Sequence, residues 1–142
     1  MYGPQERNAY KEAEILASSP ERLIPILYEH LLVNLRRGSL FIRKKDIEGK
    51  FSALAKASDI VYELIASLDH EAGGELARSL GSLYGFWIKE ISAAGRELDA
   101  DRLDRVAEMV SSLHESWIEA VGRVEGSGSS PGSASPPGVA QI

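Results

Sequence analysis

The sequence predicts an all-α protein: an antiparallel up-and-down four-helix bundle with an N-terminal arm and a disordered C-terminal tail. In four successive segments, apolar residues recur at spacings of three and four, the period of an amphipathic helix. Short polar or glycine-containing breaks separate these segments, and short connections favour antiparallel neighbours. No segment competes as a β-strand. We expect the arm over residues 1–17, the bundle over 18–122 and the tail over 123–142.

The first predicted helix covers about 20–43. Ser19 is a suitable N-cap, and Pro20 suits the first helical position, where an N–H would have no intrahelical partner. Two adjacent apolar rows run along the helix: Leu23, Leu27, Leu31 and Leu35, then Ile24, Tyr28 and Leu32. Pro25 lies inside it and should bend or loosen the first turn, because proline removes a backbone hydrogen bond.

The second predicted helix starts near Asp46 and ends near Leu68. A heptad seam runs along it through Ile47, Phe51, Leu54, Val61, Ile65 and Leu68. Ile60 and Leu64 widen the apolar face beyond what one seam requires. The segment 69–74 then interrupts the pattern, because the paired glycines Gly73 and Gly74 are poor helix formers.

The third predicted helix covers about 74–95. Its seam is Leu76, Leu80, Leu83 and Trp87, and further apolar residues flank it: Tyr84, Phe86, Ile88 and Ile91. Gly81 and Gly85 each cost about 1 kcal/mol relative to alanine in mid-helix. Two interpretations remain open: close approach of a neighbouring helix or an incoming peptide, or a weakness tolerated on the exposed side.

The fourth predicted helix begins after Asp99, a plausible N-cap, and ends near Gly122. Its seam is Leu103, Val106, Val110, Leu113, Trp117 and Val121. The residues after Arg123 are mostly glycine, serine and proline. Such a composition buries too little apolar surface to offset the entropy of ordering, so we predict disorder there.

Composition excludes several classes of function. The chain has no cysteine, which rules out disulfides and thiol chemistry, and its net charge of −5 argues against a general nucleic-acid binder. One basic cluster, Arg36, Arg37, Arg43, Lys44, Lys45 and Lys50, is either a solvated helix end or an anion-binding patch. Neither a signal peptide nor a membrane-spanning run is present, so we expect a cytoplasmic protein without membrane insertion.

The sequence contains no recognisable catalytic constellation. His30, His70 and His114 lack the spacing of metal ligands, and no glycine-rich phosphate loop follows a strand. We therefore expect no enzymatic activity, no metal and no cofactor. A signalling bundle with His30 or His114 as phospho-acceptor is an alternative, although bulky Leu31 follows His30 directly.

The remaining signal is surplus apolar surface on the second and third predicted helices. A helix that is apolar on more than one face is buried deeply or covered by a partner. An exposed apolar groove for an amphipathic segment and a well-filled core explain the pattern equally well. An adaptor for some other helix would use the same groove.

An ordered set of motifs resembles the flagellar secretion chaperones, the FliS family. The set covers residues 8 to about 121 and comprises Asn8-Ala9-Tyr10, Ala17-Ser18-Ser19-Pro20-Glu21-Arg22-Leu23-Ile24, Leu27-Tyr28-Glu29, Lys45-Asp46-Ile47-Glu48-Gly49-Lys50, Lys56-Ala57-Ser58-Asp59-Ile60-Val61, Leu64-Ile65-Ala66-Ser67-Leu68-Asp69, Gly73-Gly74-Glu75-Leu76-Ala77, Leu83-Tyr84 and Leu113-His114-Glu115-Ser116-Trp117. Pro25 and the long tail depart from the family pattern.

The resemblance implies a four-helix bundle that binds the disordered C-terminal segment of flagellin in the cytosol. Binding would prevent premature polymerisation and help deliver flagellin to the flagellar type III export gate. By the same likeness Tyr10, Ile15 and Leu16 would form a removable cap over the groove. The candidate groove residues, each of which is otherwise plain core, are Tyr28, Tyr62, Ile65, Leu68, Leu80, Tyr84 and Trp87.

Overall fold

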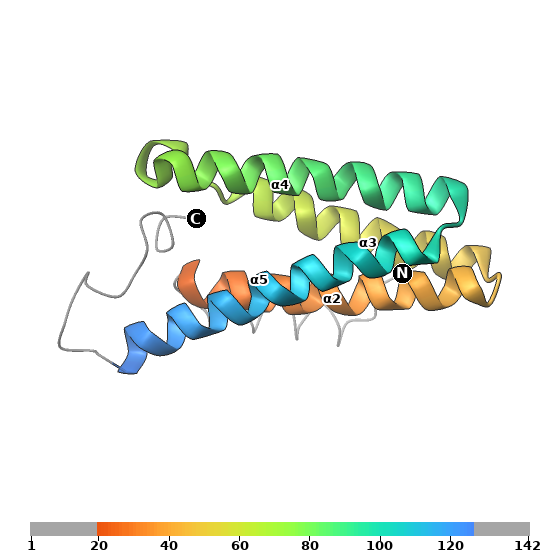
Figure 1. Cartoon of the computed structure of the whole chain (residues 1–142), viewed down its shortest axis with the longest axis horizontal. Helices are drawn as coiled ribbons and strands as arrows, with labels where there is room; N and C mark the ends of the chain where they lie inside the picture. The colour runs from red at the N-terminus through yellow and green to blue at the C-terminus, as the bar shows by residue number, and fades with distance from the viewer. Residues whose placement is uncertain (1–19, 127–142) are drawn as a thin grey trace, which may run out of the picture.

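The structure, a computed structural model, describes residues 20–126 of the chain (Figure 1). Its four helices are α2 (Pro20–Arg43), α3 (Ile47–Ala66), α4 (His70–Glu97) and α5 (Ala100–Gly126). Because the connections are only two or three residues long, successive helices run antiparallel. The predicted all-α four-helix bundle is confirmed. The predicted arm over residues 1–17, the Ser19 cap and the tail beyond residue 126 lie outside the described residues.

Local signals place most helix ends as predicted. α2 begins at Pro20 and continues through Pro25 without a break. Pro25 has no N–H to donate to the carbonyl four residues before it. That carbonyl belongs to the first turn of α2, where the loss of one hydrogen bond destabilises the helix only slightly. Asp46 caps α3 by accepting a hydrogen bond from the Gly49 N–H at 2.9 Å. Asp99 accepts one from the Arg102 N–H at 3.0 Å, which confirms it as the cap of α5.

The start of α4 differs from the prediction. The helix begins at His70, because Asp69 caps an additional turn by accepting from the N–H groups of Glu71 and Ala72 at 3.1 and 3.0 Å. The predicted break falls at Gly74, whose φ of 53° and ψ of −126° kink the helix there. Only glycine adopts this backbone conformation readily. α5 is also longer than predicted and continues past Gly122 to Gly126.

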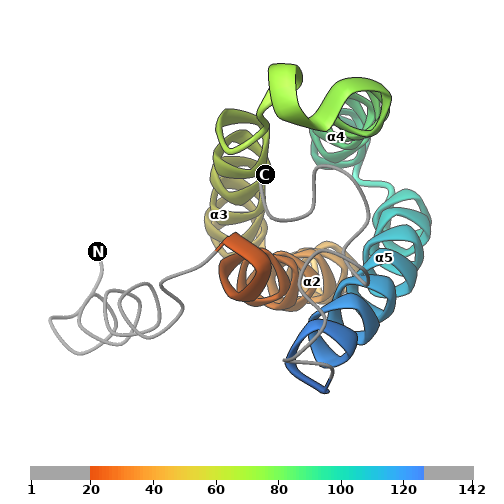
Figure 2. The ribbon, with the colours of Figure 1, turned by 90° about the vertical axis from the view of Figure 1, so that its left-hand side faces the viewer.

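The four helices form a ring in the order α2, α3, α4 and α5, seen end-on in Figure 2. The backbone of α2 approaches both of its neighbours more closely than the backbone of α4 does. Gly38 explains part of this closeness, since a Cβ there would lie 2.5 Å from Cδ2 of Leu54. The inner side of α4 carries the bulky Tyr84 and Trp87, which hold its backbone farther away.

Gly38→Ala should therefore destabilise the bundle. The added methyl group forces Leu54 or the α2 backbone to shift, and overpacking of this kind costs about 1–3 kcal/mol, of which the better helix propensity of alanine offsets up to about 1 kcal/mol. Urea denaturation followed by circular dichroism measures the loss of unfolding free energy. Unchanged or increased stability would show that the α2–α3 interface accommodates the methyl group.

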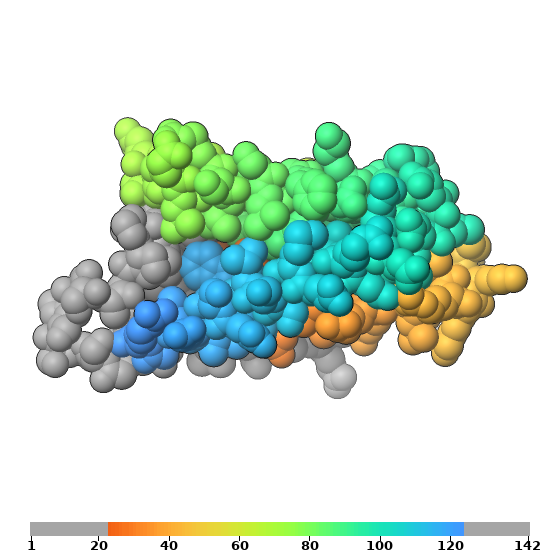
Figure 3. All heavy atoms as spheres, viewed as in Figure 1, coloured from red at the N-terminus to blue at the C-terminus, as the bar shows by residue number. Residues whose placement is uncertain are grey.

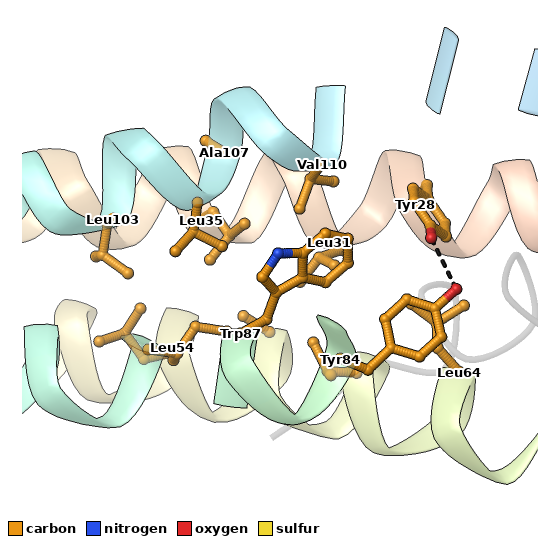
Figure 4. Packing of buried hydrophobic residues seen from close by; sticks show 14 of the residues in the cluster. Tyr28, Leu31, Leu35, Leu54, Leu64, Tyr84, Trp87, Leu103, Ala107 and Val110 are labelled. Carbon is orange, nitrogen blue, oxygen red and sulfur yellow. Dashed lines mark hydrogen bonds between the residues drawn. The ribbon is translucent and has the colours of Figure 1, made fainter. Parts of the chain in front are cut away.

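The centre of the core is aromatic (Figure 4). Tyr28 from α2 and Tyr84 from α4 meet across the bundle, with their hydroxyl oxygens 2.7 Å apart. The Trp87 ring packs against both tyrosine rings at centroid distances of 6.0 and 5.3 Å. Burial raises the pKa of both tyrosines, so the two hydroxyls stay protonated and satisfy one another.

Polar contacts tie α5 to both of its neighbours. The buried Ser39 hydroxyl donates to Oδ1 of Asp104 at 2.7 Å, and Arg43 donates to Oδ2 of the same carboxylate at 2.8 Å. Toward α4, Arg102 forms ion pairs with Glu90 at 3.2 Å and Glu97 at 3.3 Å. Side chains of α4 and α5 meet on this face, toward the right of Figure 3.

The Asp104 contacts predict a pH dependence of stability. Burial alone would raise the pKa of Asp104, but hydrogen bonds from Arg43 and Ser39 outweigh it and hold the pKa below its ordinary value. Stability from a lowered carboxyl pKa is present above the ordinary value and is lost as pH falls through the folded-state pKa. Asp104→Asn should therefore lower Tm at neutral pH and have a diminishing effect in acid. Equal losses at all pH values would contradict this account.

Candidate functional site

Four of the predicted groove residues lie in the core. Tyr28, Tyr84 and Trp87 are fully buried, and Leu80 is 6% exposed. The sequence left open whether these four residues line a groove or belong to the core, and the structure places them in the core. They therefore offer no contact surface to a partner in this conformation. The predicted cap residues Tyr10, Ile15 and Leu16 lie outside the described residues.

The other three predicted groove residues lie on or near the surface. Tyr62 is 57% exposed, while Ile65 and Leu68 are partly buried and pack against the core. All three lie in the second half of α3 or just after it. The exposed part of the predicted groove therefore lies along α3.

The predicted seam of this helix was wrong at its N-terminal end. Ile47 and Phe51 are 56% and 74% exposed and do not pack in the core. The side chains of α3 that are buried are Ala53, Leu54, Ala57, Val61 and Leu64. Two neighbouring stripes of α3 both contain residues spaced by three and four. The predicted seam began on the stripe with the larger apolar side chains, which is the exposed one. The small alanines Ala53 and Ala57 allow the close approach of α2.

The outward surface of α3 has two unlike flanks. The flank toward α2 contains Gly49, which lies directly against the Phe41 ring, and continues through polar side chains: Ser52, Lys56, Asp59 and Glu63. At 100° per residue, the opposite flank faces α4. Its residues fall within about a quarter turn of the helix and are mostly apolar: Phe51, Ala55, Tyr62 and Ile65, with the small polar Ser58 among them.

The facing flank of α4 carries small or apolar residues. A Cβ on Gly81 would lie 3.4 Å from Cδ1 of Leu68, and the Gly95 carbonyl accepts from Lys50 at 3.1 Å, so this flank adjoins α3. Gly85 and Ile88 lie on it as well, at helical spacing from Gly81. A Cβ on Gly85 would meet nothing within 4 Å. Gly81 thus contacts the α3 end, whereas Gly85 borders open space.

These residues form one candidate site, which we call the α3–α4 face: Phe51, Ala55, Tyr62, Ile65, Gly85 and Ile88. Charged side chains are absent from this set. Two exposed aromatic residues on one face, three helical turns apart, are typical anchors for an amphipathic segment. Chemically, the face is suited to binding an apolar surface.

The described part of the chain offers no alternative metal or membrane site. Within residues 20–126, no group of three or more histidine, aspartate and glutamate side chains is placed to hold a metal ion. None of the helices in that range combines the length and the apolar character required to cross a bilayer.

Comparison with known proteins gives the family. The model of the family described as "Flagellar protein FliS" matches residues 3–124. The chain belongs to the FliS family. The FliS match covers the described bundle up to residue 124, and the α3–α4 face lies within it.

Individual FliS relatives are named flagellar secretion chaperones. The chain is 38% identical to that of Campylobacter jejuni over 112 residues, covering 79% of this chain and 88% of the relative. It is 35% identical to that of Salmonella typhimurium, covering 75% and 79%. With the Escherichia coli protein the identity is 28%, covering 85% of this chain and 93% of the relative.

Gly85 gives a stability test of the site. Gly85→Ala should stabilise the fold by about 0.5–1 kcal/mol, because alanine is the better helix former and its methyl group meets open space. The midpoint of urea unfolding should rise, in contrast to the loss expected for Gly38→Ala. A fall in the midpoint would show that the space beside Gly85 is filled, contrary to the site described above.

Proposed function

We propose that this protein binds the C-terminal segment of flagellin in the cytosol, prevents its premature polymerisation and aids its delivery to the flagellar type III export apparatus. Membership of the FliS family and the names of the relatives support a secretion chaperone. The single observation in the structure that carries the proposal is the pair of exposed aromatic residues, Phe51 and Tyr62, on the largely apolar α3–α4 face.

The physical basis is coupled folding and binding. A disordered segment that becomes helical on the α3–α4 face would cover Phe51, Tyr62 and Ile65 with its own apolar side. Ordering the segment opposes part of the contact free energy, so binding can be specific and still reversible. Reversibility suits a chaperone that must release its cargo at the export gate.

Calorimetry tests the central claim. The full chain is titrated with a synthetic peptide of the C-terminal segment of flagellin from the same organism. We expect saturable binding at micromolar concentrations and a gain of peptide helicity by circular dichroism. Absence of binding heat under these conditions would refute the proposal. A pull-down from lysate separates it from a general helix adaptor, since flagellin should dominate the bound fraction.

The N-terminal arm is proposed to cover the face until flagellin displaces it. Deleting residues 1–16, which removes Tyr10, Ile15 and Leu16, should increase binding of an apolar fluorescent dye. The partner peptide should also associate faster, because nothing has to leave first. If both dye binding and association rate stay unchanged, the arm is not a cap.

A further inference from the structure

A second surface feature lies on the other flank of α3, between α3 and α2. It is a hollow of about 200 Å³, open to solvent, lined by Asn34, Arg37, Phe41, Gly49, Ser52, Ala53 and Lys56. Water occupies about 30 Å³ per molecule, so the hollow has room for one peptide residue rather than for a folded element.

The chemistry of this lining is selective. Arg37 and Lys56 line it, whereas no aspartate or glutamate does, although the whole chain has a net charge of −5. The Phe41 ring adds an apolar surface beside the two cationic groups. The hollow therefore favours an anionic group attached to a small apolar side chain.

Asn34 adds a requirement for a hydrogen-bond donor. It is 7% exposed, and its Nδ2 donates to the His30 carbonyl at 2.9 Å. Its Oδ1 is buried and has no partner among the described residues. A buried acceptor without a partner destabilises the fold, and a ligand N–H would satisfy it.

We propose that the hollow binds the free C-terminal residue of the partner polypeptide. The terminal carboxylate would pair with the Arg37 guanidinium, whose planar fork matches a carboxylate. The N–H of the same residue would donate to Asn34 Oδ1, and its side chain would lie on Phe41. This inference rests on the proposed function, because it takes the occupant to be the end of the bound C-terminal segment.

The position of the hollow fits this occupant. The hollow and the α3–α4 face lie on opposite flanks of α3. The small Ser52 and Ala55 form their adjoining edges, and the exposed Glu48 and Asp59 lie on the ridge about one turn to either side. An α-helix is about 10–12 Å wide, so three or four extended residues at about 3.3 Å each can cross it. A segment bound on the α3–α4 face can thus end in the hollow.

The test compares two forms of one peptide. The full chain is titrated with the flagellin C-terminal peptide as the free acid and as the C-terminal amide. Losing a charged hydrogen-bonding group should weaken binding roughly tenfold or more for the amide. Arg37→Met keeps the apolar stem and should abolish this difference. Arg105→Met, at an exposed position on α5, should preserve it.

The outcomes separate the two proposals. If acid and amide bind the unmodified chain equally tightly, the hollow does not read the carboxylate, while the proposed chaperone function stands. If neither form binds, the proposed function itself fails. If the Arg37→Met variant still binds the acid more tightly than the amide, the assignment of the carboxylate to this hollow is wrong. Inorganic phosphate at millimolar concentration should compete with the acid only, and equal competition against both forms would also contradict the proposal.

Discussion

Replacing both Phe51 and Tyr62 with alanine should weaken binding of the flagellin C-terminal segment by about a hundredfold or more. Aromatic side chains at the centre of an interface commonly contribute about 2 kcal/mol or more each, and their effects do not simply add. Both residues are more than half exposed in the unbound protein. The free energy of unfolding should therefore change by only about 0.5 kcal/mol. Calorimetry and urea denaturation on the same preparation measure the two effects.

The matched control is Phe86→Ala. Phe86 is also an exposed aromatic residue, 44% accessible, but it lies on the outer surface of α4, away from Gly85 and Ile88. Its removal should change affinity by less than about threefold, the scale of an energetically neutral contact. If Phe86→Ala weakens binding as much as the double variant does, the partner occupies a different face.

Trp87→Ala should cause the largest loss of stability from any single substitution considered. The Trp87 side chain is fully buried against the rings of Tyr28 and Tyr84 at the centre of the core. Truncating a large buried aromatic residue to alanine costs about 3–5 kcal/mol. Because small domains are stable by only about 5–15 kcal/mol, the variant should melt at a much lower temperature.

Two further variants keep this prediction testable even if Trp87→Ala fails to fold. Trp87→Phe retains an aromatic ring and should show an intermediate loss. Phe86→Ala, at the adjacent position, should lose about 1 kcal/mol or less, because its side chain is already partly in water. Similar losses at positions 86 and 87 would contradict the division of α4 into an inner and an outer side.

Helix ends could be predicted because their causes are local. Asp46 and Asp99 cap through their own side chains within three residues, and Pro20 suits a first turn whatever surrounds it. The capped turn after Asp69 was missed, because the paired glycines suggested one continuous break. In fact only Gly74 leaves the helical conformation.

The site was harder to predict, because burial depends on neighbouring helices. Tyr28, Tyr84 and Trp87 could have lined either a groove or the core. They lie in the core because α2 and α4 stand diagonally across the ring, so that Tyr28 meets Tyr84 and Trp87 at its centre. Phe51 was assigned to the seam because it is strongly hydrophobic. Ala53 and Ala57 are less hydrophobic, but small residues at helical spacing also indicate a closely packed flank, and these two are buried.

By itself the sequence determined four amphipathic helices, their caps and breaks, and the motif order of a family, since these depend on residues close together in the chain. Only the tertiary structure decided which of the two apolar stripes of α3 faces water. Gly38 brings α2 close to α3 beside Leu54, and the stripe of α3 that faces this contact is buried through Ala53, Leu54 and Ala57. The larger Phe51 and Tyr62 are consequently left on the outward flank, beside the open space at Gly85.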